Sequence, residues 1–142
     1  SRGATAFDPG VEGDLNAAAT AAADYAKRHG ATSMLLLAGD LPWIGPEDVV
    51  ALVDAAAHAS VVIAEAKDGG TNALLLTPPD AIPFAYATGA PSAARHAELA
   101  TARGLAPVIV NRTGLARDID LPADLRDLRA EHAAYRDLAL VA

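Results

Sequence analysis

Three aspartates, Asp40, Asp118 and Asp120, stand where carboxylates that bind a divalent metal ion are expected. Asp40 follows an apolar run almost directly, and the pair Asp118 and Asp120 comes soon after a second apolar run. Mg²⁺ takes few protein ligands and keeps its other positions for water and substrate phosphates, so carboxylates from two strand ends can share one ion. The alternative is a turn at Asp40 and a helix N-cap at Asp118 or Asp120; for Asp120, capping explains the spacing equally well.

Two glycine-containing segments have the composition of anion-binding sites. In Gly69-Gly70-Thr71-Asn72 the glycines let backbone N–H groups approach an anion closely, and the threonine hydroxyl adds an uncharged donor. In Gly89-Ala90-Pro91-Ser92 the serine stands where a helix should begin, so its hydroxyl and the first-turn N–H groups could bind an anion. A hairpin turn explains the glycine pair equally well, and Ser92 would cap its helix with or without a ligand.

Other polar residues give weaker signals. Asn16 ends a loop that leads into a helix, where it could recognise the edge of a purine, and either Asn16 or Asp14 could cap that helix. Arg95 and His96 lie one turn into the helix that begins at Ser92, so they could reach a phosphate or a carboxylate. A solvated Arg95 is the simpler outcome. The other histidines have no metal-like spacing and are expected at the surface: His29, His58 and His132.

Composition narrows the class of protein. The 142 residues carry a net charge of −7, include no Cys and are 52% hydrophobic, which fits one folded domain. The absence of Cys excludes disulfide scaffolds, zinc ribbons and thiol nucleophiles, and makes the cytoplasm the default location. An acidic chain without a basic cluster is not expected to bind nucleic acid, and no apolar run approaches the ~20 residues of a membrane-spanning helix. Serine-hydrolase, dinucleotide-binding and Walker motifs are absent from the sequence.

Alternating apolar runs and helical repeats predict the elements that position these residues. Strands are expected over residues 33–38, 60–65, 71–76 and 106–111, and helices over 15–29, 46–57, 92–103 and 122–129. The turn between the second and third strands predicts that these two form a hairpin or lie side by side. The alternation predicts one α/β domain with a mostly parallel open sheet and helices on both faces. Ligands of such sheets bind outside the carboxyl ends of the strands, where Asp40 is expected.

Three segments together resemble the guanylyltransferase family of coenzyme F-420 biosynthesis, whose members are 2-phospho-L-lactate or phosphoenolpyruvate guanylyltransferases. They are Gly39-Asp40-Leu41-Pro42, Asp68-Gly69-Gly70-Thr71-Asn72-Ala73-Leu74-Leu75 and Asp118-Ile119-Asp120-Leu121-Pro122-Ala123-Asp124-Leu125. The resemblance extends over nearly the whole chain. It implies a fold like that of the nucleotide-diphospho-sugar transferases.

The resemblance also implies a site and a reaction. Mg²⁺ would bind to Asp40 and Asp118 with Asp120 in support, and Asn16 falls in the family's order on the nucleotide side. The phosphate of a three-carbon acid would bind to Thr71, Gly89 and Ser92. An oxygen of that phosphate would attack the α-phosphorus of GTP and expel diphosphate. The acceptor would be phosphoenolpyruvate or 2-phospho-L-lactate, and the Ala-rich, Lys-poor composition favours phosphoenolpyruvate.

Two departures from the family pattern are visible. Family members carry an aromatic residue directly before the loop glycine, whereas two residues separate Tyr86 from Gly89 here. The family also opens with a strand and a basic loop that binds the GTP phosphates, and this chain is expected to lack them. Residues 1–142 alone should therefore bind GTP poorly and turn over little.

Two other functions stay open. A related nucleotidyltransferase acting on a molybdenum cofactor or a sugar phosphate would share the aspartates but not the use of Thr71 and Ser92. A non-catalytic remnant domain would keep the fold without the nucleotide loop. The oligomeric state also stays open, with a homodimer among the options.

Overall fold

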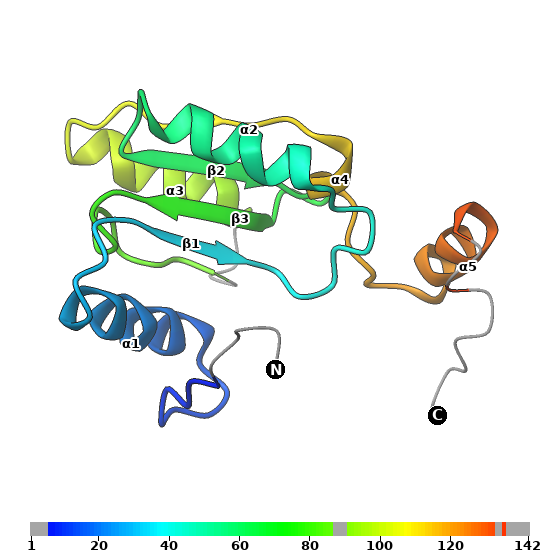
Figure 1. Ribbon diagram of the computed structural model, residues 1–142, viewed down its shortest axis with the longest axis horizontal. Helices are drawn as coiled ribbons and strands as arrows, with labels where there is room; N and C mark the ends of the chain where they lie inside the picture. The colour runs from blue at the N-terminus through cyan, green and yellow to red at the C-terminus, as the bar shows by residue number, and fades with distance from the viewer. Residues whose placement is uncertain (1–5, 87–90, 133–134, 136–142) are drawn as a thin grey trace.

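The computed structural model describes residues 6–86, 91–132 and 135, and contains a four-stranded sheet in the order β1-β3-β2-β4 (Figure 1). The strands are β1 (Met34–Leu37), β2 (Val61–Glu65), β3 (Thr71–Leu76) and β4 (Val108–Ile109). The helices are α1 (Leu15–Arg28), α2 (Pro46–Ala56), α3 (Ser92–Ala102), α4 (Thr113–Ala116) and α5 (Pro122–Glu131). Every predicted helix is present with nearly the expected bounds. The short helix α4 was not predicted, and β4 is much shorter than expected.

The sheet is mixed. β3 pairs antiparallel with both β1 and β2, and β2 pairs parallel with β4. The prediction of a mostly parallel sheet fits the common direction of β1, β2 and β4 but fails for β3. The physical reason is the short turn after β2: a parallel return needs a crossover of about a dozen residues or more, so β3 must run back as a hairpin.

This reversal determines which residues meet at the site. Thr71, the first residue of β3, pairs with Glu65 at the end of β2, and Ala73 pairs with Leu37 at the end of β1. The start of β3 therefore lies at the same rim of the sheet as the carboxyl ends of its neighbours. Ala38, just past β1, donates a further backbone hydrogen bond to the Asn72 carbonyl at 2.9 Å.

Alternate residues of β2 and β3 build the core on both faces of the sheet. On one face, Leu52 of α2 is fully buried in a cluster that includes Val62 and Leu75. On the other, Ile63 and Leu74 pack with residues of α3. Fully burying one such leucine stabilises the fold by about 2 kcal/mol. Figure 1 shows α2 in front of the sheet and α3 behind it, as the prediction of helices on both faces requires.

The remaining helices attach at the margins. Asp14 is the N-cap of α1 and accepts a hydrogen bond from the Ala17 N–H at 3.0 Å, so the cap is Asp14 and not Asn16. In Figure 1, α1 lies beside β1 and α5 lies away from the sheet. Within the described ranges, no helix combines the length and the apolar character needed to cross a bilayer.

Candidate active site

The rim of the sheet brings Asp40 beside the segment that contains Asp118 and Asp120. The Ile119 N–H donates to the Asp40 carbonyl oxygen at 3.2 Å, although the two residues lie far apart in the sequence. Asp40 is there because β1 ends at its last paired leucine, Leu37, and Asp40 follows three residues later. The second segment reaches the same place after the chain leaves α4.

The carboxylates at this rim repel one another. Repulsion from Asp118, reinforced by burial and by Asp68, Asp40 and Asp124, raises the pKa of Asp120 above its usual value. A raised carboxyl pKa means that negative charge at this point is not fully compensated by the protein. A bound cation would compensate it.

An open cavity of about 200 Å³ lies at this acidic cluster. Its lining residues are Trp43, Lys67, Asp68, Arg117, Asp118, Asp120, Leu121, Asp124 and Asp127. Carboxylate oxygens are the ligands that Mg²⁺ prefers, so the chemistry of the donor set fits this ion. In the described part of the chain, however, no three His, Cys, Asp or Glu side chains are grouped closely enough to act together as metal ligands.

The capping alternative for the two later aspartates is wrong. The N-cap of α5 is Leu121, and neither Asp118 nor Asp120 caps the helix. The Asp124 carboxylate instead accepts from the Leu121 N–H at 2.7 Å and from the Asp120 N–H at 3.2 Å. Because Asp124 supplies the reciprocal cap bonds, the α5 N-terminus does not require the side chains of Asp118 and Asp120.

A cationic side chain, Arg117, is held at the wall of the acidic cavity. Its guanidinium lies over the Trp43 ring, 3.7 Å from the centroid, and donates to both oxygens of Glu131 at 2.8 and 3.0 Å. The Trp43 indole N–H donates to the same carboxylate at 2.8 Å. The hydrogen bonds to Glu131, together with attraction to Asp127 and Asp124, raise the pKa of Arg117 and hold its charge at this wall.

A second polar cluster at the rim consists of Thr71, Ser92 and His96. The Ser92 hydroxyl donates to Thr71 Oγ1 at 2.9 Å, and His96 Nδ1 lies 3.0 Å from the same oxygen. Ser92 does not cap α3, because the N-cap is Pro91 and no side chain makes the cap bond. The structure thus joins the two predicted anion-binding residues, Thr71 and Ser92, by a direct contact. Gly89, the third, lies outside the described residues.

His96 is fully buried, whereas Arg95 beside it is exposed. His96 Nε2 accepts a hydrogen bond from the Ala85 backbone N–H at 3.0 Å, and burial lowers the pKa of the ring to about 4. The imidazole is therefore neutral at pH 7. Arg95 pairs with Glu98 at 3.0 Å on the outer side of α3.

Both ends of the Asn16 amide bond the backbone of Tyr86. Asn16 Nδ2 donates to the Tyr86 carbonyl at 3.0 Å, and Asn16 Oδ1 accepts from the Tyr86 N–H at 2.7 Å. These bonds join the start of α1 to the loop that follows β3. Recognition of a purine edge by Asn16 stays a prediction, and it would require the amide to exchange these partners.

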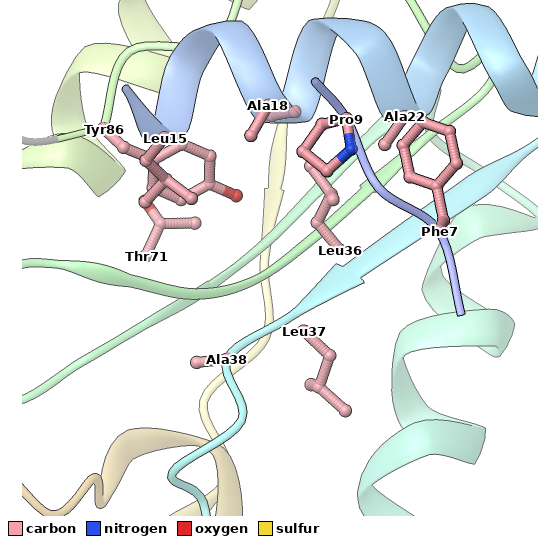
Figure 2. A pocket seen from close by; sticks show the side chains of 11 residues that line it. Phe7, Pro9, Leu15, Ala18, Ala22, Leu36, Leu37, Ala38, Thr71 and Tyr86 are labelled. Atoms are coloured by element: carbon pink, nitrogen blue, oxygen red, sulfur yellow. The ribbon is translucent and has the colours of Figure 1, made fainter. Parts of the chain in front are cut away.

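An apolar cavity of about 330 Å³ adjoins the hydroxyl cluster. Figure 2 shows Leu15 and Ala18 of α1 along one wall and Leu36 of β1 on the other, with Thr71 at one end of the cavity. The Tyr86 ring lies at the same end, and burial raises the pKa of its hydroxyl to about 12. Tyr86 is thus neutral at physiological pH and supplies an apolar face with a polar tip.

Sequence reasoning missed two residues of this region and the contacts of a third. Asp68 and Lys67 both line the acidic cavity, but the turn composition around them explained their presence without a site. His96 was noted only as a residue that could reach a ligand directly. Its position one helical turn after Ser92 was the available signal, because residues four apart lie on the same helix face.

Curated relatives carry guanylyltransferase names. A phosphoenolpyruvate guanylyltransferase from Sphaerobacter thermophilus is 46% identical over 134 residues, which are 93% of this chain and 62% of the relative. A 3-phospho-D-glycerate guanylyltransferase from Phenylobacterium zucineum is 40% identical over 76% of this chain and 46% of its own length. A 2-phospho-L-lactate guanylyltransferase from Methanothermobacter thermautotrophicus is 35% identical over 82% of this chain and 51% of its own. The chain thus spans at most 62% of these relatives.

A solved structure shares the fold. A protein from Desulfovibrio desulfuricans G20, described as a nucleotide-diphospho-sugar transferase, superimposes with a TM-score of 0.68 at 19% sequence identity, over 89% of this chain and 54% of that one. The expected nucleotide-diphospho-sugar-transferase-like fold is therefore confirmed. The family model described as "Guanylyl transferase CofC like" matches residues 7–133, so the chain belongs to the CofC-like guanylyl transferase family.

Proposed function

We propose that the protein is a guanylyltransferase that transfers GMP from GTP to a phosphorylated three-carbon acid, with release of diphosphate, in coenzyme F-420 biosynthesis. Phosphoenolpyruvate is the preferred acceptor, because the relative at 46% identity bears that name. One observation supports the proposal: Asp40, which follows β1, and Thr71, the first residue of β3, belong to the same rim of the sheet, because these two strands pair antiparallel. Two phosphorylated molecules can meet at such a rim.

The acidic cluster serves the nucleotide half of the reaction. Asp40 and Asp118, with Asp120 in support, would hold Mg²⁺, which when bound neutralises phosphate charge and polarises phosphoryl oxygens. The mutual repulsion that raises the pKa of Asp120 supports a cation at this place. Arg117, the residue before Asp118, stacks on Trp43 and donates to Glu131 of α5. These contacts fix the backbone next to Asp118 and so keep the Asp118 carboxylate at the rim.

The hydroxyl cluster serves the acid half. Thr71 and Ser92 would bind the phosphate of the acid with uncharged donors and orient one of its oxygens toward the α-phosphorus. The new bond joins that oxygen to the α-phosphorus, the bond from the α-phosphorus to the bridging oxygen breaks, and diphosphate leaves with the electron pair. The attacking oxygen is already ionised, so positioning and charge neutralisation, rather than a general base, carry the reaction.

The test is diphosphate release from GTP with phosphoenolpyruvate, 2-phospho-L-lactate or 3-phospho-D-glycerate, on residues 1–142 and on the complete product of the reading frame. We expect Mg²⁺-dependent transfer with GTP in preference to ATP and CTP. Asp40→Asn should lower turnover at least about 100-fold, or about 3 kcal/mol of barrier. Asp54→Asn on the exposed side of α2 is the matched control and should be silent.

Two results would count against this function. Unchanged turnover in Asp40→Asn would remove that carboxylate from the site. Calorimetry with Mg²⁺, GTP and phosphoenolpyruvate, added separately and together, that stays silent in every combination with the complete product would favour a non-catalytic domain.

A further inference from the structure

The hydrogen bonds of His96 determine which of its ring nitrogens carries the proton. The Ala85 backbone N–H can only donate, and it points at His96 Nε2 at 3.0 Å, so Nε2 must present a lone pair. The ring is neutral because it is fully buried, and its single proton is therefore on Nδ1. The opposite tautomer would set two N–H groups against each other in a place that water does not reach.

This tautomer in turn determines the direction of the Thr71 hydroxyl. His96 Nδ1–H faces Thr71 Oγ1 at 3.0 Å and donates to it, and the Ser92 hydroxyl donates to the same oxygen at 2.9 Å. A hydroxyl oxygen has two acceptor positions, and both are then filled. The Thr71 proton is consequently left to donate away from the cluster, and no described residue accepts it.

Thr71 stands where that donor is accessible. Its side chain is half-buried, lines the cavity of about 330 Å³ and lies at the end of that cavity shown beside Tyr86 in Figure 2. The same residue is the first of β3, at the rim that carries the acidic cluster. A donor presented here suits a ligand that only accepts hydrogen bonds, and a phosphate oxyanion is such a ligand.

We propose that His96 is a positioning residue that commits the Thr71 hydroxyl to donate to the phosphate of the acid substrate; this inference rests on the proposed function. His96 does not touch the substrate. It acts through Thr71, and its own orientation is held by the Ala85 backbone. A histidine that only filled space in the core would have no effect on the hydroxyl proton.

Two substitutions separate these roles. In His96→Asn the side-chain amide nitrogen takes the place of Nδ1, which keeps the donor to Thr71 and loses the acceptor for the Ala85 N–H. In His96→Gln the longer side chain places its carbonyl oxygen near the Nε2 position, which keeps the acceptor and loses the donor. Glu98→Gln on the exposed side of α3 is the control.

The measurement is the dissociation constant for phosphoenolpyruvate and, separately, for GTP, on the complete product of the reading frame, with the melting temperature recorded for each variant. We expect His96→Gln to weaken phosphoenolpyruvate binding about tenfold, the usual effect of losing one hydrogen bond to a charged group, and to leave GTP binding unchanged. His96→Asn should stay within about threefold of the wild type. In a Thr71→Val background, His96→Gln should have no further effect.

Nitrogen NMR of the imidazole provides a readout that does not depend on binding, and the proton is expected on Nδ1. A proton on Nε2, equal losses of phosphoenolpyruvate affinity in the two His96 variants, or unchanged affinity in His96→Gln would each overturn the inference. Failure of the wild type to bind phosphoenolpyruvate would overturn the proposed function and the inference with it. Binding by the wild type with an unaffected His96→Gln variant would overturn the inference alone.

Discussion

Acidification should destabilise the fold through His96. Burial lowers the pKa of this ring from 6.5 in the unfolded chain to about 4 in the native state. Above the unfolded value, the ring is neutral in both states and contributes no pH dependence. Between the two values the unfolded chain binds a proton that the native protein does not, so stability falls as the pH falls. The loss is complete once the pH is below the native pKa.

The magnitude follows from the shift. Each unit of pKa difference corresponds to about 1.4 kcal/mol, so the fall from 6.5 to about 4 predicts a loss of about 3 kcal/mol. Such a loss is a large part of the total stability of a domain of this size, which is about 5–15 kcal/mol. Tyr86, whose ring centroid lies 4.9 Å from that of the imidazole in an edge-to-face arrangement, does not titrate in this range.

Urea unfolding at about pH 7, 6, 5 and 4 measures the effect, with His96→Asn as the reference. Groups common to both proteins largely cancel in the difference between the two curves. The advantage of the wild type should shrink by about 3 kcal/mol across this range. Parallel curves would refute the reasoning, because they would show that the native ring takes up its proton as readily as the unfolded one.

Three other predictions concern separate parts of the structure. The carboxyl of Asp120 should titrate above its usual range by NMR and should shift downward when Mg²⁺ is added; an unmoved pKa would place the ion elsewhere. Gly114→Ala should lower the unfolding free energy by about 1–3 kcal/mol, since the added Cβ would lie 2.2 Å from Asp48 Oδ2. A variant that melts like the wild type would contradict this close approach of Asp48 to Gly114. Asn16→Asp keeps the acceptor for the Tyr86 N–H but sets a carboxylate against the Tyr86 carbonyl, so stability to urea should fall by about 1–3 kcal/mol, whereas an unchanged midpoint would show that the amide does not hold the loop.

Local signals account for the parts of the fold that were predicted from sequence. Proline and glycine mark helix ends by their own backbone preferences. Helix α2 begins at Pro46, and α1 ends at Arg28, two residues before the glycine at residue 30. The turn after β2 also predicted a hairpin as one of two arrangements, and the antiparallel pairing of β2 with β3 confirms it, because the turn is too short for a crossover. The length of β4 could not be predicted, since only Val108 and Ile109 of its apolar run pair with β2, although β2 continues to Glu65.

The site was predicted unevenly for a similar reason. Asp40 follows the end of β1, so a rule about strand ends was enough to place it at the rim. Asp118 and Asp120 reach the same rim only after α4, a helix that was not predicted. The cap role considered for Ser92 was wrong, and the prediction for His96 did not include its contact with Thr71, because both contacts depend on a partner from β3. Ser92 stands where the sequence predicts a helix cap. Because β3 runs antiparallel to its neighbours, Thr71 lies close enough to accept the hydrogen bond of the Ser92 hydroxyl instead.

The reversed strand also supports the proposed function, in which an acidic chain holds two anionic substrates. Asp40 follows the carboxyl end of β1, whereas Thr71 begins β3 at its amino end. Because the two strands pair antiparallel, a carboxylate and a hydroxyl belong to the same rim. Carboxylates that repel one another favour a cation, and hydroxyls aligned by a buried neutral imidazole favour an anion without adding charge. Had β3 run parallel, its first residue would lie at the far edge of the sheet, and the hydroxyl cluster could not face the carboxylates.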